Sequence, residues 1–148
     1  MLGKPDAGWS KVTMGEFEEY ASYLTNVPID CLEACIHRVK GKGPLAFVFE
    51  AEGPGRFFVL ATAYNTVIKW EEDDTPESCH LIPGVNDVQL VLETVHDIEQ
   101  YLNDWAEDWH TCTAEELINK LNELKELLPS WYQRENIKIS HFQKEEDQ

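Results

Sequence analysis

Cysteine and histidine are the first candidates for chemistry in this chain, because their side chains can bind zinc or act as nucleophile and base. A zinc site needs four such ligands that converge tetrahedrally, and the sequence contains no C-x2-C pair to start one. We therefore predict buried, reduced thiols, with no metal site and no catalytic residue. The candidate ligands or nucleophiles are Cys31, Cys35, Cys79, His80, His110 and Cys112.

Paired carboxylates are the second candidate, because Mg²⁺ prefers oxygen ligands and some all-helical nucleotide pyrophosphohydrolases hold it with Glu-x-x-Glu and Glu-x-x-Asp motifs on facing helices. The chain offers Glu16-x-x-Glu19, but its second motif is Glu93-x-x-x-Asp97, which is one residue too long. The C-terminal half also has few basic residues to hold a phosphate. A metal-dependent hydrolase is therefore kept only as an alternative, and we expect no enzyme and no cofactor.

The strongest signal is the distribution of acidic residues. The 148 residues include 28 Asp and Glu against 12 Lys and Arg, a net charge of −16, which argues against direct binding to nucleic acid or to an anionic membrane. Residues 71–148 hold twenty acidic and five basic residues, and no Lys or Arg lies between Lys69 and Lys120. Because a surface of one sign costs stability, we interpret this region either as adapted to a cationic partner or as a merely solubilising acidic surface.

Two acidic segments stand out. One is the Glu-Glu-Asp-Asp run at residues 71–74. The other is a stripe of four carboxylates about 60° wide when residues 86–109 are placed on a helix at about 100° per residue, with two aromatic side chains beside it. Together they predict a partner-binding surface that acts as a charge mimic of nucleic acid or docks on a basic cleft. Its residues are Glu71, Glu72, Asp73, Asp74, Glu93, Asp97, Tyr101, Asp104, Trp105 and Asp108.

The N-terminal elements are predicted to be helices. Residues 1–12 contain Gly and Pro and are expected to be loosely held. Thr13 and Glu16 have capping-box spacing, so we predict a helix from Thr13 to about Asn26. A second helix follows over residues 28–39 and is ended by glycines.

The middle of the chain reads as β-structure. Residues 44–52, 56–64 and 66–71 are rich in strand-forming side chains and are separated by turn signals such as Gly53-Pro54-Gly55. They predict an antiparallel meander of three strands. A short extended piece at Cys79 to Ile82 could add a fourth.

The C-terminal half reads as helical. Asn86 and Gln89 predict the start of an amphipathic helix of about six turns, although residues 88–93 could instead form the fourth strand. Thr113 predicts the start of a last helix that ends at Pro129. Residues 130–148 are expected to be a tail with one short strand at Ile137 to His141.

A small basic cluster in the first half offers a route to self-association. Arg38, Lys40 and Lys42 follow the second helix, and Arg56 lies at the predicted hairpin turn. Together with the acidic C-terminal half, these residues would make the molecule dipolar. The sequence therefore leaves open whether the protein is a monomer or an antiparallel homodimer.

These predictions define an α+β domain over residues 13–129, in which two N-terminal helices precede a three- or four-stranded antiparallel meander and two C-terminal helices pack on the sheet. No stretch of the sequence resembles a signal peptide or a membrane span, so we expect a cytoplasmic location. We predict a small, non-enzymatic protein that engages a basic surface of a partner protein, for example a nucleic-acid-binding protein. It would be an inhibitor, an immunity-type protein or a DNA mimic. A dimeric acidic chaperone or adaptor with an apolar groove is the alternative.

Overall fold

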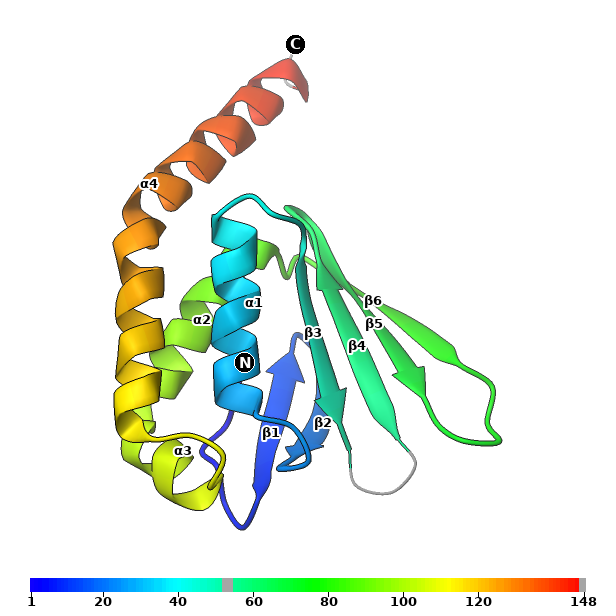
Figure 1. Ribbon diagram of the computed structural model, residues 1–148. Helices are drawn as coiled ribbons and strands as arrows, with labels where there is room; N and C mark the ends of the chain where they lie inside the picture. The colour runs from blue at the N-terminus through cyan, green and yellow to red at the C-terminus, as the bar shows by residue number, and fades with distance from the viewer. Residues whose placement is uncertain (52–54, 147–148) are drawn as a thin grey trace.

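The structure, a computed structural model, describes residues 1–51 and 55–146, the last ten of these by their backbone alone. A β-hairpin, one helix, a four-stranded antiparallel sheet and three helices follow one another along the chain (Figure 1). The fold is α+β, but the predicted arrangement with two N-terminal helices is wrong. The elements are β1 (Trp9–Met14), β2 (Phe17–Ser22), α1 (Val27–Val39), β3 (Leu45–Glu50), β4 (Arg56–Ala61), β5 (Asn65–Glu71), β6 (Ser78–Pro83), α2 (Asp87–Gln100), α3 (Leu102–Asp108) and α4 (Ala114–Glu146).

The first predicted helix is in fact the β1–β2 hairpin. Burial in β1 alternates with a period of two, so that Val12 is buried while Thr13 faces solvent. Gly15 makes the turn with φ +57°, and a Cβ atom there would lie 2.8 Å from Cγ2 of Ile82. The Thr13-x-x-Glu16 spacing therefore spans a tight turn, and strand periodicity overrides the apparent capping box.

The N-terminal segment, expected to be loose over residues 1–12, is paired with β1 instead. Leu2 forms an antiparallel bridge with Val12, and the amide of Thr13 donates a hydrogen bond to the carbonyl of Met1 at 2.9 Å. Met1 and Leu2 are both buried in the core. The segment therefore behaves as an added edge of the hairpin.

Helix α1 and the four-stranded sheet confirm the predictions for the centre of the chain. The helix occupies the predicted residues within one or two positions, and Gly41 beyond its end has φ +72°. The strand order is β3-β4-β5-β6, with β6 formed from the short extended piece. The predicted first strand ended at residue 52 and the turn included residues 53–54, and these three residues lie outside the described part of the chain.

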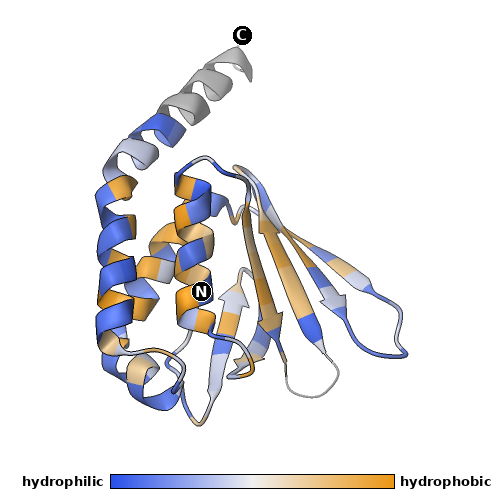
Figure 2. Cartoon of the chain, in the orientation of Figure 1, coloured by the Kyte–Doolittle hydropathy of each residue, from blue (hydrophilic) through white to orange (hydrophobic). Residues whose placement is uncertain are grey.

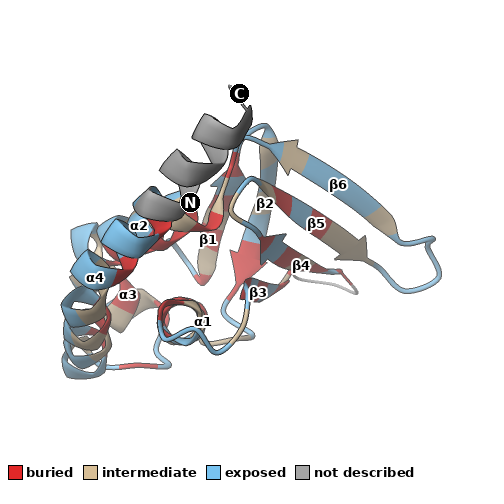
Figure 3. Cartoon of the chain, turned by 90° about the horizontal axis from the view of Figure 1, so that it is seen from above, coloured by how far each residue is buried: buried red, intermediate tan, exposed pale blue. Residues whose placement is uncertain are grey.

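The two faces of this sheet differ. The inner face carries buried side chains such as Phe49 and Phe57, whose rings stack with centroids 4.9 Å apart. All described helices lie on this side, with α1 directly against β3 (Figure 3). The outer face has no described element over it, although apolar residues run along β3 and β4 (Figure 2).

The predicted six-turn helix is divided into α2 and α3. Helix α2 begins as predicted, with the Asn86 side chain accepting a hydrogen bond from the Gln89 amide at 2.9 Å, so the alternative strand at 88–93 is not formed. Tyr101, at φ −116° and ψ 33°, interrupts the helix. Trp105 and Trp109 of the following segment are both buried, with ring centroids 5.0 Å apart.

Helix α4 begins at the predicted capping box but continues far beyond its predicted end. The Thr113 hydroxyl accepts from the Glu116 amide at 3.1 Å, and the Glu116 carboxylate accepts from the Thr113 amide at 3.0 Å. The predicted stop at Pro129, the tail and the strand at Ile137 to His141 are wrong, because the helix runs to Glu146. The last two residues of the predicted tail, 147–148, are outside the described residues.

A buried charge cluster holds α4 beyond its proline. A proline inside a helix costs about 3 kcal/mol, and α4 bends in its second half (Figure 1). Beyond Pro129, Trp131 is buried and lies under the guanidinium of Arg38, 5.5 Å from the ring centroid. Arg38 also pairs with Asp87 at 2.9 Å and with Glu135 at 3.6 Å. These contacts tie α1, α2 and α4 together and offset the cost of the proline.

None of the helices in the described residues combines the length and the apolar character needed to cross a lipid bilayer.

Candidate functional site

The predicted acidic surface is divided into separate regions. The loop that carries residues 71–74 joins β5 to β6 at one end of the sheet, whereas α2 and α3 lie among the helices on the other side of the molecule (Figure 1). The break at Tyr101 also interrupts the straight row of carboxylates that a charge mimic of a nucleic-acid strand would need. The carboxylates of each region have different contacts.

The carboxylates of α2 are occupied by the protein's own N-terminal segment. The α-ammonium group of Met1 lies 2.8 Å from the Asp97 carboxylate and 3.6 Å from that of Glu93. The backbone amide of Leu2 donates a second hydrogen bond to Asp97 at 2.9 Å. Only 15% of the Asp97 side chain is exposed. This half of the predicted stripe fixes the N-terminal segment in place.

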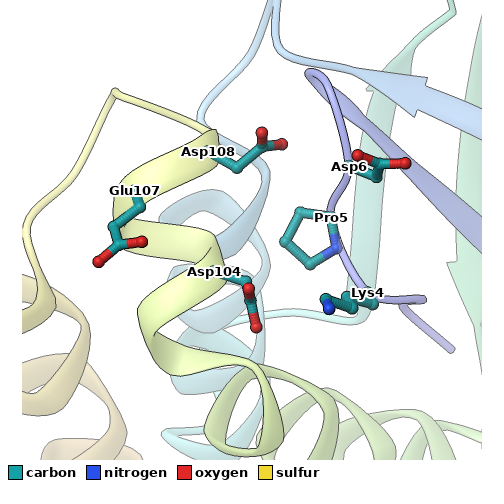
Figure 4. A pocket seen from close by; sticks show the side chains of 6 residues that line it. All are labelled: Lys4, Pro5, Asp6, Asp104, Glu107 and Asp108. Atoms are coloured by element: carbon teal, nitrogen blue, oxygen red, sulfur yellow. The ribbon is translucent and has the colours of Figure 1, made fainter.

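The carboxylates of α3 line an open pocket of about 450 Å³ between this helix and the N-terminal segment. The ring of Pro5 faces α3 between Asp104 and Asp108 (Figure 4). One oxygen of Asp108 accepts a hydrogen bond from the amide of Gly8 at 3.0 Å. The lining residues are Lys4, Pro5, Asp6, Asp104, Glu107 and Asp108.

The charge of this pocket is not neutralised from within. Among residues 1–51 and 55–146, no ion pair involves Asp6, Asp104 or Glu107, and Lys4 is the one cationic side chain of the lining. Glu107 and Asp108 also lie in the last turn of α3, where the helix dipole favours cations over anions. The local charge of four carboxylates against one ammonium would therefore be relieved by a cation from outside.

The two aromatic residues of the predicted surface, Tyr101 and Trp105, differ in how far their side chains are buried. Trp105 is fully buried and packs on Trp109, so it is unavailable as a surface anchor, while Tyr101 is half-buried against the core. The accessible aromatic ring beside the α3 pocket is Tyr23, which is exposed and lines a second, mainly apolar pocket of about 370 Å³. Asp108 lines both pockets, so they are neighbours. No sequence pattern connected Tyr23 with α3, since the two meet only in the folded chain.

The β5–β6 loop is partly neutralised. Glu71 pairs with Lys69 at 2.8 Å and Arg56 at 3.4 Å, and the hydrogen bond from the Lys69 ammonium lowers the pKa of the Glu71 carboxyl. Asp73 and Asp74 have no ion pair with any described residue and are exposed. Only the tip of this loop is thus a free acidic surface.

The cysteines and histidines do not assemble a metal site within the described residues, where no three potential ligands come together. Cys31, Cys35 and Cys112 are buried free thiols, and Cys79 is an exposed one. Burial raises the pKa of the Cys35 thiol to about 12 and that of Cys112 to about 11, and it raises the pKa of Cys31 as well. These three side chains therefore stay protonated and unreactive at neutral pH.

The carboxylate pair of the hydrolase alternative is also rearranged. Glu16 lies in the turn of the β1–β2 hairpin and Glu19 in β2. A pair three residues apart shares a face of a helix but not of a strand. The helical Glu-x-x-Glu geometry is therefore not formed.

Comparisons with protein-family models, with curated proteins and with solved structures returned no match for this chain.

Proposed function

We propose that this protein is a small, non-enzymatic binding protein that engages a basic surface of a partner protein, as an inhibitor or an immunity-type protein. The observation that carries the proposal is the α3 pocket. Its carboxylates Asp6, Asp104 and Glu107 have no ion pair among the described residues. The pocket is open to solvent, so a cationic side chain of a partner can enter it.

The pocket suits an arginine or lysine side chain of the partner. Charge-assisted hydrogen bonds from such a side chain to Asp104 and Glu107 would each contribute about 1.5–3 kcal/mol. The neighbouring apolar pocket beside Tyr23 would receive an uncharged part of the same partner, since aromatic side chains are frequent anchors at interfaces. An acidic site of this kind also accelerates encounter with a cationic protein at low ionic strength.

Calorimetric titration with a short peptide rich in Arg and Lys, at low and at high salt, tests the proposal. The test variant carries Asp6→Asn, Asp104→Asn and Glu107→Gln. The matched control carries Glu16→Gln, Glu115→Gln and Glu126→Gln, which change the net charge by the same amount at exposed side chains outside both pockets and outside the β5–β6 loop.

We expect the α3 variant to bind the peptide at least about tenfold more weakly than the control, because each lost charged hydrogen bond costs about that factor. Equal binding by the two variants would mean that the peptide responds only to net charge, and the α3 pocket would then not be a binding site.

A dimeric chaperone or adaptor with an apolar groove is the second candidate function. It is favoured by one observation, namely the exposed apolar side chains on the outer face of the four-stranded sheet. Size-exclusion chromatography with light scattering tests it, since that function requires a dimer and the binding protein proposed above does not.

A further inference from the structure

The outer face of the four-stranded sheet is an apolar surface with no described element over it. One cross-strand row runs from Ala46 on β3 through Leu60 and Val67 to Leu81 on β6. The neighbouring row runs from Val48 through the less exposed Phe58 and through Lys69, whose ammonium lies over the Phe58 ring, to Cys79. An exposed apolar patch that spans several strands is uncommon on a monomer and marks a contact surface.

Strand β6 forms an open edge of this sheet. It pairs with β5 and with no other strand in the described residues, so its second row of backbone donors and acceptors is free of strand pairing. Natural proteins protect such edges with charged residues, but β6 has the sequence Ser-Cys-His-Leu-Ile-Pro with no Lys, Arg, Asp or Glu. Pro83 ends the strand, and the Leu81 side chain is 61% exposed. The edge is thus available to another extended chain.

The charge beside this edge indicates the kind of chain. The loop that leads into β6 carries Glu72, Asp73 and Asp74, none of which has a cationic partner among the residues described. A segment lying along β6 would meet these carboxylates at the end of the strand that begins with Ser78. Lysine or arginine at that end of the segment would complement them.

A second copy of the protein fits this edge less well. Each chain carries a net charge of −16, so two copies repel. Three of the four residues in the basic cluster that self-association would use are engaged internally, since Arg38 pairs with Asp87, Lys40 with Glu123, and Arg56 with Glu71. In the described part of the chain, Lys42 is the one member of this cluster without an ion pair, so the acidic loop would meet a single free cation of the cluster on another copy.

We propose that β6 and the outer sheet face bind an extended segment of a partner protein, which adds to the sheet as a fifth strand. Every second side chain of the segment is apolar and lies beside Cys79 and Leu81 on the outer face, and basic residues at one end contact the loop at residues 72–74. This surface is separate from the α3 pocket, and the inference does not depend on the function proposed for that pocket.

Hydrogen exchange in the presence of a designed peptide tests the proposal. The probe alternates valine and threonine and carries three lysines at its C-terminal end, and a second probe carries them at its N-terminal end. A third probe carries glutamates instead. We expect at least one lysine probe to slow exchange of amides in residues 78–83, with its polarity indicating an antiparallel or a parallel added strand, and we expect no effect of the glutamate probe.

A matched pair of variants tests the edge itself. Leu81→Lys places a charge on the exposed edge and is expected to weaken peptide binding at least tenfold. Leu24→Lys makes the same change at a side chain that is 57% exposed and lies outside the sheet, and it is expected to leave binding unchanged. Equal binding by both variants would overturn the proposal.

Two further outcomes distinguish partner binding at β6 from binding at the α3 pocket and from self-association. If the variant with Asp6, Asp104 and Glu107 neutralised loses the probe and Leu81→Lys does not, the probe binds at α3, and the β6 proposal fails while the α3 pocket is supported. If residues 78–83 are protected without peptide, and light scattering shows a dimer that Leu81→Lys dissociates, a second copy occupies the edge and the proposal is overturned.

Discussion

The acidic residues of α2 and of α3 have similar spacing in the sequence but different surroundings in the fold. On α2, Asp97 and Glu93 hold the ammonium group of Met1, and Asp97 also accepts from the amide of Leu2. On α3, Asp104 and Glu107 line an open pocket and have no ion pair among the described residues. A row of like charges along one stretch of sequence can therefore be part of the scaffold in one turn and a candidate binding surface two turns later.

The largest loss of stability is expected when Arg38 is removed, because this arginine pairs with two buried carboxylates. Arg38→Ala removes the cation that pairs with the Asp87 carboxylate and with the Glu135 carboxylate, and these two side chains are only 2% and 7% exposed. Breaking such a pair from one side costs about 3–5 kcal/mol, so we expect the free energy of unfolding to fall by that amount in urea denaturation. Arg134→Ala, an exposed arginine on α4, is the control and should change it by less than about 0.5 kcal/mol.

A smaller loss is expected at the α2 half of the stripe. Asp97→Ala leaves the ammonium of Met1 with only the more distant Glu93 and removes the acceptor for the Leu2 amide. Because an unsatisfied partly buried donor costs about 1–3 kcal/mol, we expect destabilisation in that range and faster hydrogen exchange in residues 1–12. If stability were unchanged, the α2 carboxylates would be no more integral to the fold than those of α3.

The α3 half should respond in the opposite direction. Asp104 and Glu107 are one helical turn apart, and Asp104 and Asp108 are also neighbours on the helix surface. Like-charge pairs at these spacings destabilise a helix by about 0.2–0.5 kcal/mol each. Neutralising Asp104 and Glu107 should therefore raise the thermal stability slightly, whereas a clear loss of stability in a thermal scan would show that these carboxylates have structural partners.

The smallest expected effect is the response of this repulsion to salt. Moderate salt screens exposed charges over about 8–10 Å. Added sodium chloride should therefore stabilise the wild type by a few tenths of a kcal/mol more than the variant with Asp104 and Glu107 neutralised. An identical salt response would indicate that the α3 carboxylates do not repel one another measurably.

Local sequence signals predicted those parts of the fold in which local and tertiary preferences agree. The meander of β3 to β5 and the helix α1 follow from strand-forming runs, turn residues and helical spacing. The caps at Asn86 and Thr113 form the hydrogen bonds that their spacings predicted. At these positions the residues that favour each local structure also bury the apolar side chains of the core.

The incorrect predictions arose where contacts between residues far apart in the sequence determine the secondary structure. Thr13 and Glu16 mimic a helix start, but burial of alternate residues against the core selects a hairpin. Pro129 signals a helix end, but Trp131 and the Arg38–Glu135 pair stabilise the helix beyond it. Similarly, a helical projection drawn through Tyr101 merges α2 and α3, and it contains no sign that residues 1–8 lie across the carboxylates.

An NMR titration of the isotope-labelled protein with a short basic peptide at low salt shows directly whether the α3 pocket binds cations. If the α3 pocket is the binding surface, amide shifts should concentrate in residues 4–8 and 104–111, and they should vanish when Asp6, Asp104 and Glu107 are neutralised. Shifts that spread over all acidic surfaces in proportion to their charge, or that persist in that variant, would contradict the account.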